Sequence, residues 1–451
     1  MEKNLTTGSV CKNLLSFSLP YLLSYFLQTL YGMADLFITG QFNTTDSITA
    51  VSIGSQVMHM LTVMIVGLAM GATVNIGQAV GANDREKAAD TIGNTVTLFM
   101  VVSLALTALL VALVRPIVSV MSTPAEAVAG TIQYLTVCFI GIPFITAYNI
   151  ISSIFRGIGD SKSPMYFIAV ACAANIALDC LFIGGLGLGP MGAALGTTIA
   201  QTISVIAALI TIFKRETGIS LGKECFLPKR LIMKPILSVG IPVALQDGFI
   251  QISFILITII ANRRGLDDAA AVGIVEKVIS FLFLVPSTML STVSALSSQN
   301  IGAGKHDRAA LSLRYAVTIC VGFGLAAALA IQFVAEPVVA LFDKTPEVVL
   351  AGGQYLRGYI WDCVFAGVHF SFSGYFCAYG KSGISFLHNT LSILLVRIPG
   401  AYLMSKFFAD TLLPMGCAAA AGSFLSVIVC MIASLLLRQR RPEWRGEYER
   451  A

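Results

Sequence analysis

The segment QAVGANDREKAA, residues 78–89, returns later in the chain as QNIGAGKHDRAA, residues 299–310. The two copies begin 221 positions apart (78 to 299), and at the same offset the triplet QYL of residues 133–135 recurs at 354–356. Matches that keep their order over such distances indicate an internal duplication. We therefore predict that the chain consists of two homologous halves with the same sequence of helices.

The composition is typical of a membrane protein. The chain has 451 residues, of which 56% are hydrophobic and only 12% are charged, whereas an average soluble protein carries about 25% charged residues. Apolar runs of about 20 residues, the length that crosses a bilayer, recur along the chain with short polar connections. We predict an all-α polytopic membrane protein with twelve transmembrane helices, at residues 14–39, 50–76, 90–113, 131–155, 164–184, 192–213, 235–261, 270–296, 311–334, 350–377, 384–407 and 416–437.

Each predicted half holds an even number of spans, so both halves enter the membrane from the same side. Such a parallel repeat is related by a pseudo-two-fold axis along the membrane normal. Two six-helix bundles with a cleft between them are typical of an alternating-access transporter. The predicted parts are an N-terminal lobe at 1–213, a cytoplasmic linker at 214–234, a C-terminal lobe at 235–437 and a cytoplasmic tail at 438–451.

The positive charges give an orientation and exclude other classes. Lys and Arg concentrate on one side when both termini are placed in the cytoplasm, which predicts a protein of the inner (plasma) membrane. This bias explains the net charge of +5 without nucleic-acid binding. The ten cysteines form no CxxC pair, so no metal site or disulfide framework is predicted. Because no catalytic constellation is visible, we expect no enzyme and no cofactor, and a monomer suffices for the cleft.

Polar residues inside one apolar run indicate a site. The stretch NIALD, residues 175–179, places Asn175 and Asp179 four positions apart, on one face of a helix. A carboxylate at the bilayer centre costs at least about 2.5 kcal/mol, and Asp35 in the first span can face this pair. Such oxygen groups suit a hard cation, by extension of the rule for divalent ions, or a proton. A coupling site for Na⁺ or H⁺ and a hydrogen-bonded staple between helices are the two interpretations.

Four segments together resemble the multidrug and toxic compound extrusion (MATE) transporters: LPYLLSYFLQTLYGMADLFITGQF (19–42), QAVGAND (78–84), IFRGIGDSKSPM (154–165) and RIPGAYL (397–403). The resemblance covers essentially the whole chain. It implies the MATE fold and export of amphipathic, often cationic compounds, driven by inward movement of Na⁺ or H⁺.

Within that family the chain is most similar to the prokaryotic DinF-like branch. The resemblance implies a cation-coupling site in the N-terminal half, made by Asp35, Asn175, Asp179 and Thr197, with Thr198 beside it. The NorM-like branch has acidic ligands in spans seven and ten. Here those positions fall near Gln251 and Ala366, neither of which is acidic. This departure from the NorM-like pattern favours the N-terminal site. Asp362 lies nearby in span ten, so a variant of the C-terminal site stays open.

Other buried polar residues are weaker candidates. They either line the substrate cavity or form interhelical hydrogen bonds. In the C-terminal half there are two interpretations: Asp247, Glu276, Lys277 and Asp362 form an ionic cluster, or Glu276 and Lys277 lie near the outer interface. Arg397 is expected to pair with an acid or a carbonyl. The candidate substrate-lining residues are Gln28, Tyr31, Gln56, Asn149, Gln201, Gln251 and Asp362.

Pro20 is a candidate hinge, because a proline inside a helix weakens the hydrogen-bond ladder and allows a bend. The predicted function is a secondary active multidrug antiporter, with amphipathic drugs or toxins and the lipid bilayer as partners. The alternative is a flippase for a lipid-linked oligosaccharide, which has a related fold. A flippase would need a cationic cavity for pyrophosphate, and the N-terminal pocket is acidic.

Overall fold

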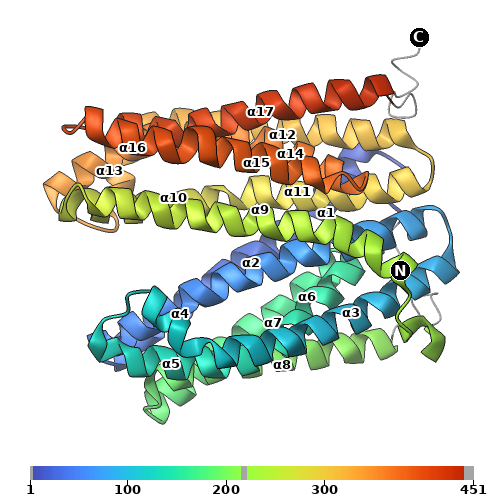
Figure 1. Cartoon of the computed structure of the whole chain (residues 1–451), viewed down its shortest axis with the longest axis horizontal. Helices are drawn as coiled ribbons and strands as arrows, with labels where there is room; N and C mark the ends of the chain where they lie inside the picture. Colours follow the sequence, from blue (N-terminus) through green and yellow to red (C-terminus); the bar gives the residue numbers. More distant parts are fainter. Residues whose placement is uncertain (1–3, 215–220, 441–451) are drawn as a thin grey trace. The chain divides into compact units, whose positions relative to one another are not determined.

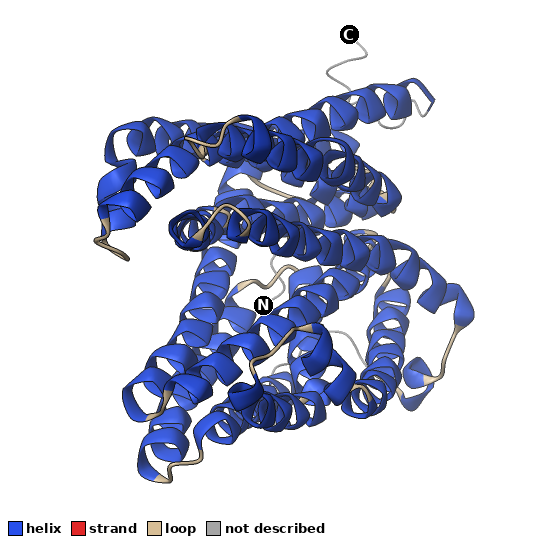
Figure 2. Ribbon diagram, turned by 60° about the vertical axis from the view of Figure 1, so that its left-hand side comes forward, coloured by secondary structure: helices blue, strands red, loops and turns tan. Residues whose placement is uncertain are grey.

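The computed structural model describes residues 4–214 and 221–440, and Figure 2 shows these residues as helices joined by loops, without a strand. The C-terminal part of the predicted tail and part of the predicted linker lie outside the described residues. The first half of the chain forms α1 (Val10–Phe42), α2 (Thr45–Gly81), α3 (Arg85–Ala112), α4 (Val114–Val120), α5 (Ala125–Ile140), α6 (Ile142–Gly157), α7 (Lys162–Asp179), the π-helix η1 (Cys180–Gly185) and α8 (Gly189–Lys214).

The second half begins with a short 3₁₀-helix and is coloured from green to red in Figure 1. Its elements are η2 (Lys223–Phe226), α9 (Arg230–Asn262), α10 (Leu266–Leu282), α11 (Leu284–Gly302), α12 (His306–Ala340), α13 (Pro346–Tyr359), α14 (Trp361–Ala378), α15 (Ser382–Ser392), the π-helix η3 (Ile393–Arg397), α16 (Ile398–Phe407) and α17 (Leu413–Arg440).

Each of the twelve predicted spans is helical. Nine helices of the described chain are long and apolar enough to cross a membrane, or ten if α5 and α6, bent by 48° at their junction, form one span. The remaining predicted spans, α1 and the pair α13–α14, are not among the helices that meet this criterion of length and hydropathy. Polar residues lower the hydropathy of these helices: Gln28 and Asp35 lie in α1, Arg357 lies in α13 and Asp362 lies in α14.

The helices form two compact units whose boundaries differ from those of the predicted lobes. Residues 5–18 belong to the C-terminal unit, and the N-terminal unit extends from Leu19 to Gly240. Leu14 and Phe17 lie in one core cluster with residues of α11 and α12. Gly240 meets the backbone of Leu68 so closely that a Cβ would overlap it. Packing, and not the position of the charged linker, thus decides where each unit begins.

The described part of the predicted linker, residues 221–234, packs against α3 through hydrogen bonds. Asn94, which is fully buried, donates to the carbonyl of Cys225 at 3.0 Å and accepts from the amide of Lys229 at 2.7 Å. Thr97 donates to the carbonyl of Phe226 at 2.7 Å. The Lys229 ammonium lies 2.5 Å from the Asp90 carboxylate, and this hydrogen bond raises the pKa of Lys229. The linker therefore follows the N-terminal unit into α9.

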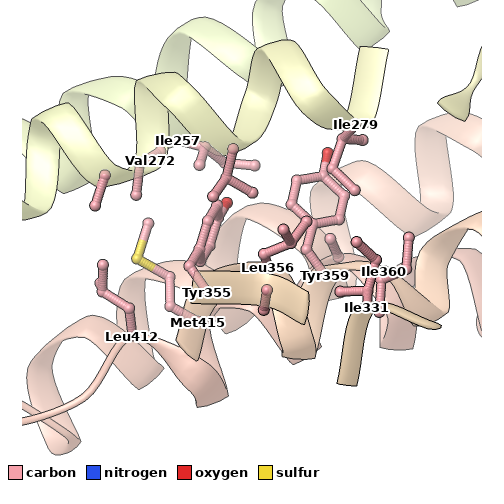
Figure 3. Packing of buried hydrophobic residues seen from close by; sticks show 14 of the residues in the cluster. Ile257, Val272, Ile279, Ile331, Tyr355, Leu356, Tyr359, Ile360, Leu412 and Met415 are labelled. Carbon is pink, nitrogen blue, oxygen red and sulfur yellow. The ribbon is translucent and has the colours of Figure 1, made fainter. Parts of the chain in front are cut away.

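Aromatic and aliphatic side chains fill both cores. In the N-terminal unit, the rings of Phe155 and Phe167 meet edge to face with centroids 5.5 Å apart. In the C-terminal unit, Figure 3 shows Tyr355 and Tyr359 of α13 among side chains from α9, α10, α12 and α17. The two tyrosine rings also meet edge to face, at 5.5 Å. These contacts fix the helices that carry the buried polar groups described below.

Candidate cation-coupling site

Asp35 and Thr197 meet between two helices of the N-terminal unit. The hydroxyl of Thr197 on α8 donates a hydrogen bond to Oδ2 of Asp35 on α1 at 3.1 Å. The exposed fractions are 3% for Asp35 and 5% for Thr197, so the bond is shielded from solvent. A charged hydrogen bond in such surroundings is stronger than one in water.

Asn175 and Asp179 bring α7 to the same place. Both side chains are fully buried, and both adjoin the carboxyl group of Asp35. Their spacing of four residues places them on one face of the helix, as the sequence predicts. Asp179 is the last residue of α7, and the π-helix η1 begins directly after it. A change of helix type at this point is frequent at functional sites.

Gly196 allows Asp179 to approach α8. A Cβ atom built at Gly196 would overlap Oδ1 of Asp179, so any larger residue would displace the carboxylate or the helix. The helices α7 and α8 pack along each other (Figure 1). Sequence reasoning did not single out Gly196; its position directly before Thr197 was the available signal.

Many polar atoms of this cluster have no hydrogen-bond partner among the described residues. They are Oδ1 of Asp35, both carboxylate oxygens of Asp179 and both side-chain polar atoms of Asn175. Buried polar atoms are rarely left unpaired in proteins. Two carboxylates, an amide oxygen and a hydroxyl are oxygen donors of the kind that hard cations prefer. The same carboxylates repel each other when both are ionised, which a shared proton relieves. The donor set therefore fits Na⁺ or H⁺.

Thr198 is placed differently from its neighbour. Its hydroxyl and methyl groups face Gly141, at the break between α5 and α6, where a Cβ would lie 2.7 Å from each of them. Thr197 takes the contact with Asp35. Consecutive residues of an α-helix point about 100° apart, so only one of two adjacent threonines reaches the carboxylate. The expectation that Thr198 belongs to the coupling set is not supported by this placement.

The candidate substrate-lining residues of the N-terminal unit fall into three places. Tyr31 lies beside Thr197 and the buried Gln201, next to the cation cluster. Gln28 and Asn149 line a small cavity that none of the coupling residues lines. Gln56 is exposed. Only Tyr31 and Gln201 are thus brought to the proposed coupling site.

The polar cluster of the C-terminal unit has a different composition from the one expected. Asp362 and Arg397, both buried, face each other at 3.7 Å, and Arg397 also donates to the hydroxyl of Tyr359. Glu276 accepts from Thr258 at 3.3 Å. Lys277 is exposed, because the residue after Glu276 points to another side of α10. Lys277 therefore does not join this cluster, and the expectation that Arg397 pairs with an acid is confirmed.

Gln251 and Pro20 complete the candidate set. Gln251 on α9 is half-buried. Pro20 lies inside α1, two residues after the point where the helix passes from the C-terminal unit to the N-terminal unit. The hydroxyl of Ser24 donates to the carbonyl of Pro20 at 2.9 Å. A weakened ladder and a change of packing partner thus coincide at one position of α1.

Comparison with known proteins agrees with this architecture. The family model MatE matches residues 20–181 and 242–403, once in each half. The chain is 28% identical over 412 residues to the Bacillus subtilis protein named "Probable multidrug resistance protein YpnP", covering 91% of this chain and 92% of that one. It is 24% identical over 404 residues to the Staphylococcus aureus protein named "Multidrug export protein MepA", covering 89% of each.

Solved structures show the same fold. One is described as the outward-facing conformation of a multidrug resistance MATE family transporter of the MOP superfamily. It superposes with a TM-score of 0.90 at 22% identity and covers 97% of both chains. A crystal structure of a MATE protein in complex with MaL6 gives a TM-score of 0.89 at 23% identity.

Proposed function

The chain belongs to the MATE family, and from this premise we propose that it is a multidrug antiporter that exports amphipathic, often cationic compounds in exchange for Na⁺ or H⁺. The names of its relatives support export of drugs, since YpnP is described as a multidrug resistance protein and MepA as a multidrug export protein. Their similarity extends over about nine-tenths of the chain. The finer proposal, ion coupling by alternating access, depends on the cation cluster.

The observation that carries the proposal is the pair of buried carboxylates, Asp35 and Asp179, with oxygens that have no partner in the described chain. An intramembrane acid of this kind is a functional candidate because its burial costs free energy. Asn175 and Thr197 supply the neutral groups of the site. A bound Na⁺ and a bound proton each cancel one of the two negative charges of the ionised pair, so the two ions compete for one place.

Exchange requires that the charge of this pair changes the shape of the protein. Asp35 lies on α1 within the N-terminal unit, and the same helix begins in the C-terminal unit. We propose that α1 bends near Pro20 when the carboxylates gain or lose a cation. A helix that belongs to both units is suited to transmit this change. The drug and the ion would then be bound alternately.

Orientation and surroundings complete the proposal. The excess of Lys and Arg on one side supports the proposal that both termini lie in the cytoplasm and that the protein belongs to the plasma membrane. One chain is enough to form the transporter. Its substrates are small amphipathic compounds that reach it from the cytoplasm or the bilayer.

Transport of ethidium in inside-out membrane vesicles tests the proposal. A Na⁺ gradient is imposed at constant pH, and a pH gradient is imposed separately without Na⁺. Ethidium accumulation driven by one gradient, absent from vesicles without the protein, would support the antiporter and identify its ion. No accumulation with either gradient would contradict ion-driven drug export and favour the flippase alternative.

A further inference from the structure

Arg156 is a buried cation without an acidic partner in the described chain. It ends α6 with an exposed fraction of 9%, and no described carboxylate lies within ion-pair distance. Asp160, the nearest acid in the sequence, is engaged elsewhere, because it accepts from the amides of Lys162 at 2.9 Å and Ser163 at 3.1 Å. A buried charge without a counterion is costly, so this guanidinium calls for an explanation.

The contact of Arg156 with Tyr21 explains only part of its environment. The guanidinium carbon lies 4.9 Å from the centre of the Tyr21 ring, which is a cation–π distance. This contact uses the face of the guanidinium. Its five N–H donors point outward in the plane, and none of them is matched with an acceptor in the structure described. The edge of Arg156 is therefore available to a ligand.

A cavity lies at this edge. Arg156 lines it together with the polar side chains of Ser24, Gln28 and Asn149 and with the tyrosines of α1 and α6. Its volume of about 20 Å³ gives room for one small polar group. Arg156 is the only charged residue in the lining. The cavity therefore has the opposite charge preference from the Asp35–Asp179 cluster, although α1 contributes to both.

We propose that this cavity binds an oxyanion, the carboxylate or phosphate group of an amphipathic molecule, with Arg156 as its main partner. A planar guanidinium pairs with carboxylate and phosphate oxygens through two parallel hydrogen bonds. The tyrosine rings offer apolar surface to the first carbons of the ligand, and Gln28 offers amide hydrogen bonds. Binding of the anion requires no ion gradient, so it stands or falls independently of the proposed antiport.

Fluorescence of 11-(dansylamino)undecanoic acid tests this site on the purified full chain in a non-ionic detergent. The matched ligand is its methyl ester, which has the same chain without the charge. Wild type is expected to bind the acid about tenfold more tightly than the ester. In Arg156→Gln this preference should disappear, whereas Arg115→Gln, which removes an exposed arginine of α4, should retain it. Equal binding of acid and ester by wild type would overturn the proposal.

One further variant and one competition measurement complete the test. Arg156→Lys preserves the charge without the planar fork, so it should retain a reduced preference for the acid even if Arg156→Gln unfolds. A preference that survives in a folded Arg156→Gln would overturn the assignment of Arg156. In phosphatidylcholine nanodiscs, added phosphatidylglycerol that blocks the acid identifies a lipid headgroup as the source of the oxyanion. Unchanged binding of the acid identifies a free amphipathic anion.

Discussion

The hydroxyl of Thr197 on α8 donates to the carboxylate of Asp35 on α1 at 3.1 Å, across 162 positions of sequence. Its neighbour Thr198 faces Gly141 instead. The two threonines therefore differ in contact although they are adjacent and chemically identical. This difference allows the contribution of one hydrogen bond to the coupling site to be isolated.

Thr197→Val should weaken ion coupling. The substitution keeps the shape of the side chain and removes the hydrogen bond to Asp35, which is worth on the order of 1.5–3 kcal/mol for a charged acceptor. We expect the concentration of the driving ion at half-maximal ethidium transport to change by about tenfold. Thr198→Val is the matched control and should leave it within about twofold. Equal effects of both variants would show that the hydrogen bond is not specific to the site.

Gly196→Ala should disturb the position of Asp179. A Cβ at this residue would overlap the Asp179 carboxylate, and overpacking of a buried site costs about 1–3 kcal/mol. Ion-driven ethidium transport should therefore fall while the protein still inserts in the membrane. Gly273→Ala is the control, because nothing lies within 4 Å of the added atom. Normal transport by a folded Gly196→Ala would refute the close approach.

Arg397→Gln should destabilise the C-terminal unit. Removing one member of a buried ion pair leaves Asp362 as an uncompensated charge, which costs about 3–5 kcal/mol. The double variant Arg397→Gln/Asp362→Asn should recover part of this loss. Resistance to unfolding by sodium dodecyl sulfate measures both effects.

A more exposed pair serves as the control for that experiment. Arg357 and Glu336 lie 3.0 Å apart with side-chain exposed fractions of 29% and 40%, so Arg357→Gln should cost less than about 1 kcal/mol. If Arg397→Gln were no more harmful than Arg357→Gln, the pair with Asp362 would not be structural.

Pro20→Ala should impair the proposed bending of α1. The variant restores a regular helix at the point where α1 passes between the units, so we expect slower ethidium transport with unchanged ethidium binding. Pro337 also lies inside a helix, α12, but within one unit. Pro337→Ala should therefore transport normally. Unaltered transport rates in Pro20→Ala would count against the hinge.

The helices and the core of the candidate site could be predicted from the sequence. Apolar runs of membrane length identify helices because the bilayer leaves no alternative for the backbone. The NIALD spacing places Asn175 and Asp179 on one face because helix geometry is periodic. These predictions depend only on local rules that hold for any long helix.

What the sequence did not reveal depends on contacts between distant helices. Nothing local tells which of Thr197 and Thr198 points to Asp35, or that Arg397 and not Lys277 faces Asp362. The packing of residues 5–18 in the C-terminal unit likewise results from contacts with α11 and α12. Whether Arg156 has an acidic partner likewise depends on the positions of acids on other helices, which only the tertiary structure gives.

The central claim is that Asp35 and Asp179 couple the ion to the drug, and reconstituted proteoliposomes test it most directly. Two activities are measured in the same preparation: accumulation of labelled ethidium driven by the coupling ion, and exchange of ethidium for ethidium without a gradient. In Asp179→Asn we expect the driven accumulation to disappear and the exchange to continue, while Asp267→Asn, which changes an exposed acid of α10, should keep both. Ion-driven accumulation by Asp179→Asn at the wild-type level would contradict the account.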